Sequence, residues 1–431
     1  MEGMSDLEAE SVRLQLKAMF IPDDPEIIPL NVGSPGMDQI KRSRDVMAAA
    51  MQSMLEAPVT SYRELAFQYG ISKGDFVFRT ELANFLEQQT GFRPDPENLL
   101  ATGGCSQSVH FASSVFLRTG MTVFVEDPTF YSVTRIFTRD LKLNVIPVPT
   151  DKNGLIVEKL EKLIKKHVIP KKHERQMFTC MLYIISVFHN PTGRCLHPDR
   201  CRKLVQIARK YDMLILTDDV YTLLQFDGRQ RPPPRLVTYD SKTDPDYKGN
   251  VISCGSFSKI LSPGIRLGWL ESGDRIIQTV AESGLFVAQG GFNQFGTALV
   301  AEALKQKLVL PHLRFIRQIL YDRMTAICDI LEEQLPFGCE FVRPKGGYFV
   351  WVKLPDYIDT SAMLNVVRET KKVTFLPGNR SSPGGGNHNF LRICFGYLEK
   401  EVMMKGVRNL CDGIQNYMEE KQEDNQQSSH L

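Results

Sequence analysis

The segment from Ser256 to Trp269 carries the residues whose types and spacing point most directly to chemistry. Lys259 follows two hydroxyl side chains, Ser256 and Ser258, and Arg266 comes seven residues later. A lysine amine can form a Schiff base with an aldehyde cofactor, while hydroxyls and a guanidinium can hold a phosphate group. The pattern therefore predicts a phosphorylated aldehyde cofactor attached to Lys259. The alternative is a solvated loop lysine, because most lysines lie on protein surfaces.

Three polar segments elsewhere in the chain fit the same cofactor. The small-residue turn 102–107 runs into a helix pattern, and such a turn presents backbone N–H groups to an anion. Asp218 could keep a ring nitrogen protonated, so that the ring accepts electrons, while Asn190 and Tyr221 could hydrogen-bond a ring oxygen. Taken singly, these segments also suit a turn, a helix cap and a core tyrosine. Each follows a predicted strand, however, and open α/β sheets bind ligands at the carboxyl ends of their strands.

Taken together, these segments resemble the fold-type I pyridoxal 5′-phosphate (PLP) enzymes, specifically the class I/II aminotransferases of the aspartate aminotransferase superfamily. The kynurenine/2-aminoadipate aminotransferase-like branch is the most similar, and the resemblance spans residues 30–410. It implies that Lys259 binds PLP covalently and moves the substrate proton, and that Asp218 pairs with the ring nitrogen. It also implies that Asn190 and Tyr221 hydrogen-bond the phenolate oxygen. The phosphate ligands implied are Ser256, Ser258, Arg266 and the backbone amides of Gly104, Cys105 and Ser106.

The same resemblance assigns roles to residues outside these segments. Phe130 matches the aromatic residue that stacks on the cofactor ring, and Arg392 matches the arginine that binds the substrate α-carboxylate. Gly33 and Asn190 would lie beside the substrate. Tyr69 matches a tyrosine that reaches the phosphate from the neighbouring subunit, so the resemblance implies a homodimer with shared active sites.

The function implied is transfer of an amino group between an amino acid and a 2-oxo acid by a ping-pong aldimine mechanism. Two alternatives stay open. The same cofactor cradle supports lyase or decarboxylase chemistry, and relatives fused to a helix-turn-helix act as non-catalytic PLP-binding regulators. We expect the regulator to be the weaker alternative, because few residues precede Gly33 and the net charge is near zero.

The glycine-rich segment Gly346–Trp351 is predicted to form a strand, and Phe349 within it is a candidate for lining the pocket.

Hydrophobic periodicity predicts the elements that position these residues. Short apolar runs at 122–125, 143–147, 181–186, 214–217 and 251–254 alternate with helix patterns at 78–90, 106–119 and 198–211. This alternation predicts an α/β fold, a large domain with a mainly parallel sheet flanked by helices. A long helix at 308–335 would lead to a smaller α+β domain. The division we expect is an N-terminal segment (1–60), a large PLP-binding domain (61–315), a small domain (316–418) and a flexible tail (419–431).

Composition excludes several other classes of protein. The 431 residues carry 52 basic and 50 acidic side chains, a net charge of +2, which argues against a nucleic-acid partner. No apolar run is long enough to cross a membrane, and the nine cysteines are scattered without metal-ligand spacing. We therefore expect a cytoplasmic protein with no metal and no membrane partner. The final Ser429-His430-Leu431 resembles a relaxed peroxisomal address, and that location is the alternative.

Overall fold

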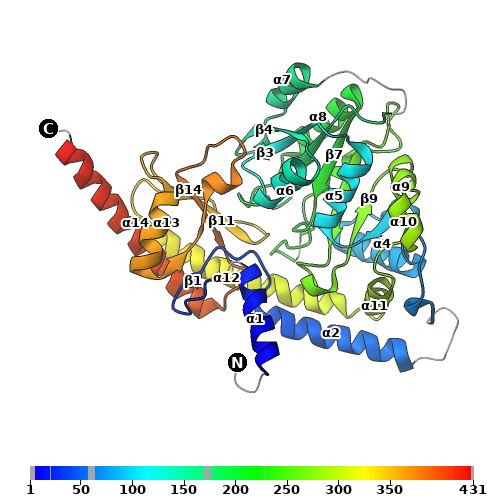
Figure 1. The fold of residues 1–431 in the computed structure, drawn as a ribbon, viewed down its shortest axis with the longest axis horizontal. Helices are drawn as coiled ribbons and strands as arrows, with labels where there is room; N and C mark the ends of the chain where they lie inside the picture. Colours follow the sequence, from blue (N-terminus) through cyan, green and yellow to red (C-terminus); the bar gives the residue numbers. More distant parts are fainter. Residues whose placement is uncertain (1–4, 20, 57–63, 169–175, 229, 429–431) are drawn as a thin grey trace.

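The structure is a computed structural model that describes residues 5–19, 21–56, 64–168, 176–228 and 230–428. Its largest feature is a sheet of eight strands (Figure 1). In spatial order these are β2 (Leu99–Thr102), β9 (Gly268–Glu271), β8 (Val251–Ser256), β7 (Met213–Asp218), β6 (Cys180–Ile184), β3 (Thr122–Asp127), β4 (Asn144–Asp151) and β5 (Gly154–Leu155). The neighbours from β8 to β4 pair in parallel, whereas β9 and β5 pair antiparallel. The mainly parallel sheet predicted from the sequence is confirmed.

Helices cover both faces of this sheet. One face packs on α5 (Cys105–Phe116) and α9 (Asp274–Ala281), the other on α7 (Val157–His167) and α8 (Pro198–Tyr211). Alternation along β3 sends Val123 and Val125 into the first core and Phe124 into the second. Because neither face meets water, β6, β7 and β8 are buried at every residue, which explains why their sequences are mostly apolar rather than alternating.

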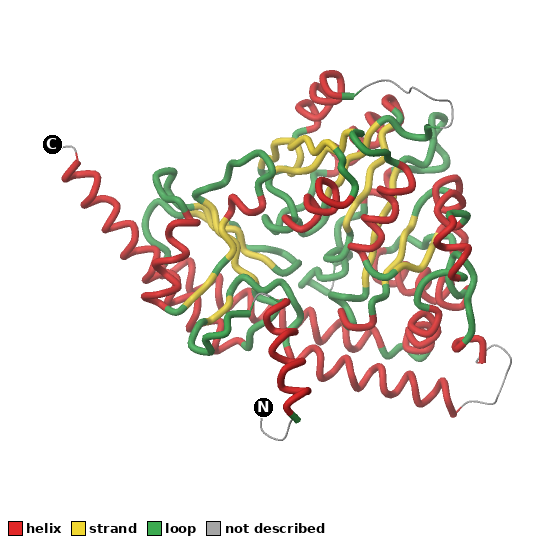
Figure 2. Tube along the Cα trace, in the orientation of Figure 1, coloured by secondary structure: helices red, strands yellow, loops and turns green. Residues whose placement is uncertain are grey.

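A second, antiparallel sheet of four strands lies apart from the first (Figure 2). Its order is β10 (Glu340–Phe341), β11 (Phe349–Lys353), β14 (Phe390–Cys394) and β13 (Leu376–Pro377). Apolar side chains of α12 (Val309–Gln334), α13 (Thr360–Lys371) and α14 (Lys400–Ser428) share one core with this sheet. The smaller α+β part of the predicted fold is therefore confirmed.

The remaining elements lie outside these two sheets and the helices named above. They are α1 (Asp6–Ala18), β1 (Ile28–Pro29), α2 (Met37–Glu56), η1 (Leu65–Phe67), α4 (Phe76–Thr90), η2 (Pro96–Asn98), α6 (Tyr131–Arg135), η3 (Ile136–Asp140), η4 (Leu236–Tyr239), η5 (Pro263–Ile265), α10 (Gly284–Gln289), α11 (Gln294–Lys305), β12 (Val373–Thr374) and η6 (Gly378–Ser381). β1 pairs in parallel with β12, and the Leu30 carbonyl accepts a hydrogen bond from Cys394 N at 2.7 Å. The N-terminal segment therefore runs beside strands from the other end of the chain.

The C-terminal stretch differs from the sequence prediction. We expected a flexible tail over 419–431, whereas α14 continues as a helix to Ser428 and extends away from the rest of the molecule (Figure 1). The stretch holds three glutamates, three glutamines and one lysine and no proline or glycine, so intrinsic propensity favours extension of the preceding helix. The tripeptide Ser429-His430-Leu431 lies outside the described residues.

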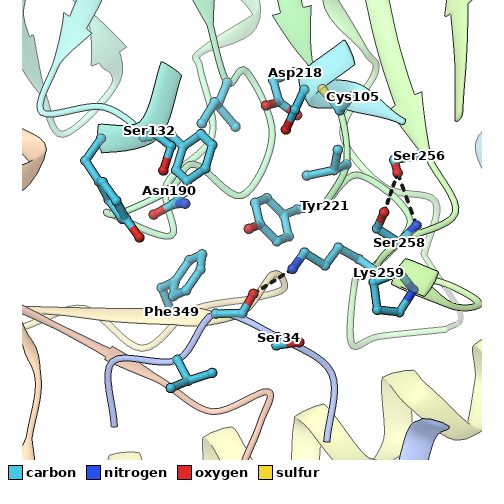
Figure 3. Close-up of a pocket in the computed structure, with 18 of the residues that line it drawn as sticks. Ser34, Cys105, Ser132, Asn190, Asp218, Tyr221, Ser256, Ser258, Lys259 and Phe349 are labelled. Atoms are coloured by element: carbon cyan, nitrogen blue, oxygen red, sulfur yellow. Dashed lines mark hydrogen bonds between the residues drawn. The ribbon is translucent and has the colours of Figure 1, made fainter. Parts of the chain in front are cut away.

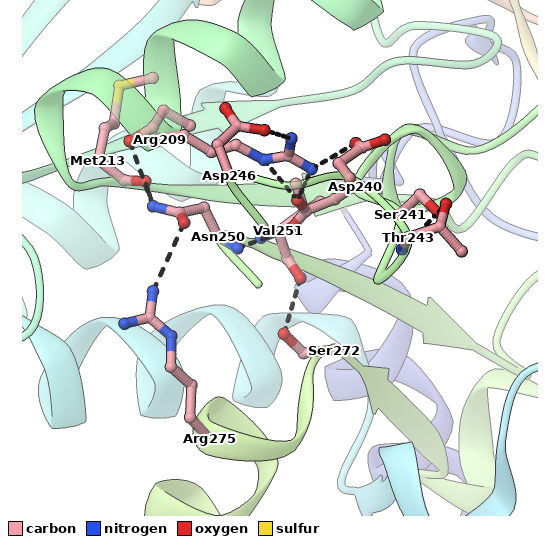
Figure 4. Close-up of polar contacts among 12 residues, drawn as sticks. Arg209, Met213, Asp240, Ser241, Thr243, Asp246, Asn250, Val251, Ser272 and Arg275 are labelled. Atoms are coloured by element: carbon pink, nitrogen blue, oxygen red, sulfur yellow. Dashed lines mark hydrogen bonds and ion pairs between the residues drawn. The ribbon is translucent and has the colours of Figure 1, made fainter. Parts of the chain in front are cut away.

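A polar cluster fixes the ends of β7 and β8 opposite to the chemistry-bearing residues (Figure 4). Asn250, just before β8, donates from Nδ2 to the Met213 carbonyl at 2.9 Å, which sets the register between the two strands. Arg209 at the end of α8 is buried and pairs with Asp240 at 2.8 Å and Asp246 at 2.6 Å. Asp240 in turn accepts from the Asn250 backbone N–H at 2.7 Å. These bonds fix where β7 and β8 begin. The residues at the opposite ends of the two strands are therefore held in a fixed register.

Candidate active site

A cavity of about 760 Å³ lies where β7 and β8 end, facing the four-stranded sheet. Most of the predicted site residues line it: Gly33, Cys105, Ser106, Phe130, Asn190, Asp218, Tyr221, Ser256, Ser258, Lys259, Arg266 and Arg392. Figure 3 labels seven of them: Cys105, Asn190, Asp218, Tyr221, Ser256, Ser258 and Lys259. Gly104 lies directly behind the wall as the N-cap of α5. Tyr69 does not line the cavity; its side chain is 80% exposed on the molecular surface.

Lys259 reaches the middle of the cavity from the turn that follows β8. Its Nζ donates to the Gly33 carbonyl oxygen at 2.6 Å and lies 5.3 Å from the centre of the Tyr348 ring. Desolvation lowers the pKa of Lys259 to about 8, from an ordinary value near 10.5. Burial therefore favours the neutral amine, which is the nucleophilic form.

Asp218, the last residue of β7, presents a carboxylate with one satisfied oxygen. Its Oδ2 accepts from the Tyr183 hydroxyl at 2.9 Å, whereas its buried Oδ1 has no hydrogen-bond partner among the described residues. Desolvation by burial raises the pKa of Asp218. A buried, half-satisfied carboxylate is a binding position for a cation or an N–H donor. The protonated ring nitrogen of PLP is both a cation and an N–H donor, so the Asp218 carboxylate is suited to bind it.

Hydroxyl and guanidinium groups gather at the end of the cavity near α5. Ser256 Oγ donates to Ser258 Oγ at 2.9 Å, and Arg266 Nη2 donates to the Gly103 carbonyl at 2.9 Å. Gly104 adopts φ +98°, which opens the backbone ahead of α5, and a Cβ there would lie 2.9 Å from Arg266 Nη2. The start of a helix, a cation and two hydroxyls at one place match the needs of a phosphate group.

Aromatic side chains form the walls between these two polar ends. Tyr221 is buried, with its ring centre 5.7 Å from that of Tyr348 and 5.6 Å from that of Phe349. Phe130 is half-buried at the N-terminus of α6. Phe130, Tyr221 and Phe349 thus give the cavity aromatic walls, which suit a heteroaromatic cofactor. The predicted place of Phe349 in the pocket wall is confirmed.

Arg392 on β14 faces the opposite end of the cavity. Its Nη1 donates to Asn190 Oδ1 at 2.9 Å, and its Nη2 donates to the Asn31 carbonyl at 2.8 Å. The guanidinium lies 4.1 Å from the centre of the Phe349 ring, and its buried Nε has no partner among the described residues. An oriented, desolvated guanidinium of this kind is suited to a carboxylate.

Several residues of the site escaped the sequence analysis. Tyr183 donates a hydrogen bond to Asp218, but in the sequence it is one residue of an apolar strand pattern. The Asn31 carbonyl is a backbone group, so no residue type in the sequence could indicate its contact with Arg392. Arg135 and Arg380 also line the cavity. His189 is buried behind Asn190, with Nε2 3.1 Å from Glu126 Oε2. It does not line the cavity.

Two other kinds of site are absent from the part of the chain that the structure describes. No cluster of His, Cys, Asp or Glu suited to a metal ion occurs among the described residues. In the same part of the chain, no helix is both long and apolar enough to span a bilayer.

Comparison with known proteins gives matches along nearly the whole chain. The family described as aminotransferase class I and II matches residues 25–410. A 2-aminoadipate transaminase of Thermus thermophilus is 29% identical, over 95% of this chain and 94% of its own. Aromatic-amino-acid aminotransferase 1 of Thermococcus litoralis is 26% identical, over 96% and 93%. A solved Pyrococcus horikoshii kynurenine aminotransferase, in complex with PMP, superposes with TM-score 0.78 at 29% identity, over 96% of this chain and 97% of that one.

Proposed function

The chain belongs to the aminotransferase class I and II family, and we propose which of its residues perform the family's PLP-dependent transfer of an amino group. It is a transaminase of fold type I that acts on amino acids and 2-oxo acids. When bound, PLP supplies an electron-accepting ring that weakens bonds at the substrate α carbon. The roles of the individual residues are our proposal. They are supported by the convergence of Lys259, Asp218 and Arg392 on one cavity.

Lys259 is the residue we assign to cofactor attachment and proton transfer. Its neutral amine is favoured by burial, so Nζ can act as a nucleophile near neutral pH. Once released by the incoming amino acid, the same Nζ can take the proton from the substrate α carbon and later return a proton. The Gly33 carbonyl, 2.6 Å from Nζ, orients the amine before the cofactor is attached.

The residues around Lys259 hold and tune the cofactor. Asp218 pairs with the ring nitrogen and keeps it protonated, with Tyr183 fixing the orientation of the carboxylate. Asn190 and Tyr221 are assigned to the phenolate oxygen, and Phe130 to the ring face. The phosphate is assigned to Ser256, Ser258, Arg266 and the backbone amides of Gly104, Cys105 and Ser106. The φ of +98° at Gly104 and the position of Arg266 beside it support that assignment.

Arg392 is assigned to the substrate α-carboxylate, beside Asn190 and Gly33. Its two hydrogen bonds to Asn190 and Asn31 fix the plane of the guanidinium, which leaves Nε for a carboxylate oxygen. We therefore propose that the donors are amino acids with a free α-carboxylate. The relatives named for 2-aminoadipate, aromatic amino acids and kynurenine all act on such donors.

We also propose that the protein is a homodimer in which Tyr69 serves the partner's cofactor phosphate. Exposed apolar side chains gather around Tyr69, namely Leu65, Phe67, Ile71, Phe76, Val287 and Phe295, which we call the apolar patch. Its two chain segments lie together, because the Phe67 and Phe295 ring centres are 5.6 Å apart and Gln294 donates to the Leu65 carbonyl. An apolar surface of this kind favours burial against another subunit. We place the dimer in the cytoplasm, with the peroxisome as the alternative.

The decisive experiment combines reduction of the holoenzyme with an activity assay. Borohydride should fix a phosphopyridoxyl group on Lys259, identified by peptide mass spectrometry. Lys259→Ala should lower transfer to 2-oxoglutarate by at least about 10³-fold, because it removes nucleophile and base together. Lys242→Ala is the control, since Lys242 is an exposed residue paired with Asp274. A label on another lysine would contradict the proposal. Release of more than one equivalent of 2-oxo acid per active site without an acceptor would indicate a lyase, because a transaminase stops after one half-reaction.

A further inference from the structure

Two arginines that line the active-site cavity have no assigned counterion. Among the described lining residues, five are lysine or arginine (Lys259, Arg266, Arg392, Arg135 and Arg380), and Asp218 is the one Asp or Glu. The proposed function, on which this inference rests, uses the first three together with Asp218. The cofactor phosphate takes Arg266 and the substrate α-carboxylate takes Arg392. Arg135 and Arg380 remain without a role.

Arg135 lies at the substrate end of the cavity. It is the last residue of α6 and follows Ser132 by three positions, so the two side chains share one face of that helix. Figure 3 shows Ser132 beside Asn190, at the opposite end of the cavity from Ser256 and Ser258. Since Asn190 is bonded to Arg392, Arg135 lies on the α-carboxylate side of the site rather than on the phosphate side.

Arg380 reaches the same region from the four-stranded sheet. It belongs to η6, which follows β13 directly, and Leu376 on β13 pairs with Arg392 on β14. The Thr129 backbone N–H donates to the Ser381 carbonyl at 2.7 Å, which ties η6 to the segment that leads into α6. The arginines of α6 and η6 are therefore carried by two segments that are hydrogen-bonded to each other.

A second hollow of about 330 Å³ continues from the cavity between these segments. It shares Tyr131, Thr134 and Arg380 with the main cavity, and no Asp or Glu is among the described residues that line it. Arg135 and Arg380 make no ion pair with any described residue. Room for a substrate side chain is thus bordered by the Arg380 guanidinium and by hydroxyls, without a carboxylate among the described lining residues. Arg135 lines the main cavity next to Thr134, a residue that both hollows share.

We propose that Arg135 and Arg380 bind the distal carboxylate of a dicarboxylic substrate, an amino or 2-oxo acid whose side chain ends in a second carboxylate. Both arginines are exposed, so water solvates them before the substrate arrives. A bound dicarboxylate displaces that water, and the remaining charge pairs gain strength as the local dielectric falls. Charge-assisted hydrogen bonds of this kind correspond to about a tenfold effect on affinity for each arginine.

Substrate pairs that differ by one carboxylate test the proposal kinetically. We expect the wild-type holoenzyme to prefer glutamate to norvaline and 2-oxoglutarate to 2-oxopentanoate, measured as ratios of kcat/KM. Arg135→Gln and Arg380→Gln should each lower these ratios about tenfold, mainly through KM. Arg139→Gln is the control, since Arg139 is an exposed arginine that does not line the cavity, and it should leave the ratios unchanged.

A binding measurement gives a second readout that needs no turnover. By calorimetry, the holoenzyme should bind glutarate about tenfold or more tightly than pentanoate, and the double variant Arg135→Gln/Arg380→Gln should bind the two equally. Unchanged ratios in both single variants, or an equal loss in Arg139→Gln, would overturn the proposal. If the wild type transfers no amino group from any donor, the proposed function fails instead. If the enzyme transfers amino groups but both variants keep the wild-type kcat/KM ratios, the distal carboxylate site is refuted and the proposed function stands.

Discussion

Lys259 and Asp218 illustrate how burial acts on opposite charges at the scale of single residues. Desolvation lowers the pKa of the lysine and raises that of the aspartate, because each group is driven towards its neutral form. In the function proposed above, a protonated ring nitrogen would give the Asp218 carboxylate a partner and favour its ionised form. Burial thus favours the nucleophilic form of Lys259, and we expect Asp218 to ionise once the cofactor pairs with it.

The shifted pKa of Lys259 predicts a pH profile for the cofactor-free protein. A lysine whose pKa falls from near 10.5 to about 8 becomes nucleophilic at lower pH. Labelling of Lys259 by a small amine-specific reagent should therefore rise about tenfold per unit up to pH 8 and then level off. Peptide mass spectrometry after short exposure measures this profile. A free lysine peptide is the reference, and a Lys259 midpoint as high as that of the peptide would contradict the prediction.

Residues of the site that lie in compact motifs could be predicted from the sequence, and those held by distant partners could not. Local spacing was enough to predict Lys259 with its neighbouring serines, and likewise Asp218 with Tyr221. Arg135 and Arg380 lie 245 positions apart and show no local pattern, so only the fold brings them to one cavity. The residue roles themselves stay predictions, which the variants described above test.

At the scale of elements, the turn before α5 depends on one glycine. A Cβ at Gly104 would be strained at φ +98° and would displace the Arg266 guanidinium. Gly104→Ala should cost about 1 kcal/mol of stability and weaken PLP binding about tenfold. Gly120→Ala is matched for backbone strain, at φ +83°, but its Cβ would meet nothing within 4 Å. It should lower the thermal midpoint similarly and leave the PLP Kd unchanged, as fluorescence titration would show.

Loss of the Arg209 cluster near the start of β8 should lower the free energy of unfolding by more than the glycine substitution does. Arg209→Ala would leave the buried carboxylate of Asp240 without its cation, and we expect a loss of about 3–5 kcal/mol in the free energy of unfolding. Arg202→Ala, on the same helix, removes an exposed pair with Asp199 and should cost less than about 0.5 kcal/mol. Urea denaturation compares the two variants. Equal midpoints would show that the Arg209 cluster contributes nothing to anchoring the strands.

Periodicity located most elements closely, and the exceptions have physical reasons. α8 begins and ends at the predicted residues, because Pro198 marks its first turn and its apolar face is regular. β9 was not predicted: it is a short antiparallel strand inside the lysine motif, stabilised by pairing with β2 and β8 rather than by its own pattern. The division at residues 60, 315 and 418 stays a prediction.

At the scale of the whole molecule, the apolar patch makes the dimer testable. Phe67→Asp should place a charge in the subunit interface and weaken association about 100-fold, because central aromatic residues dominate such interfaces. Sedimentation velocity should then show monomers at concentrations where the wild type is dimeric. Phe337→Asp changes a fully exposed phenylalanine outside the patch and should leave the dimer intact. A monomeric wild type with full activity would refute the shared site.

The pairing of β1 with β12 has a consequence for synthesis on the ribosome. The Asn31 carbonyl that holds Arg392 precedes it by 361 positions, and the Gly33 carbonyl that meets Lys259 precedes it by 226. The earliest translated part of the fold must therefore wait, unpaired, for strands that emerge last. Activity therefore requires almost the entire polypeptide to leave the ribosome. A nascent chain halted before β14 already contains Lys259, but it lacks Arg392 and so the contacts proposed to select a substrate.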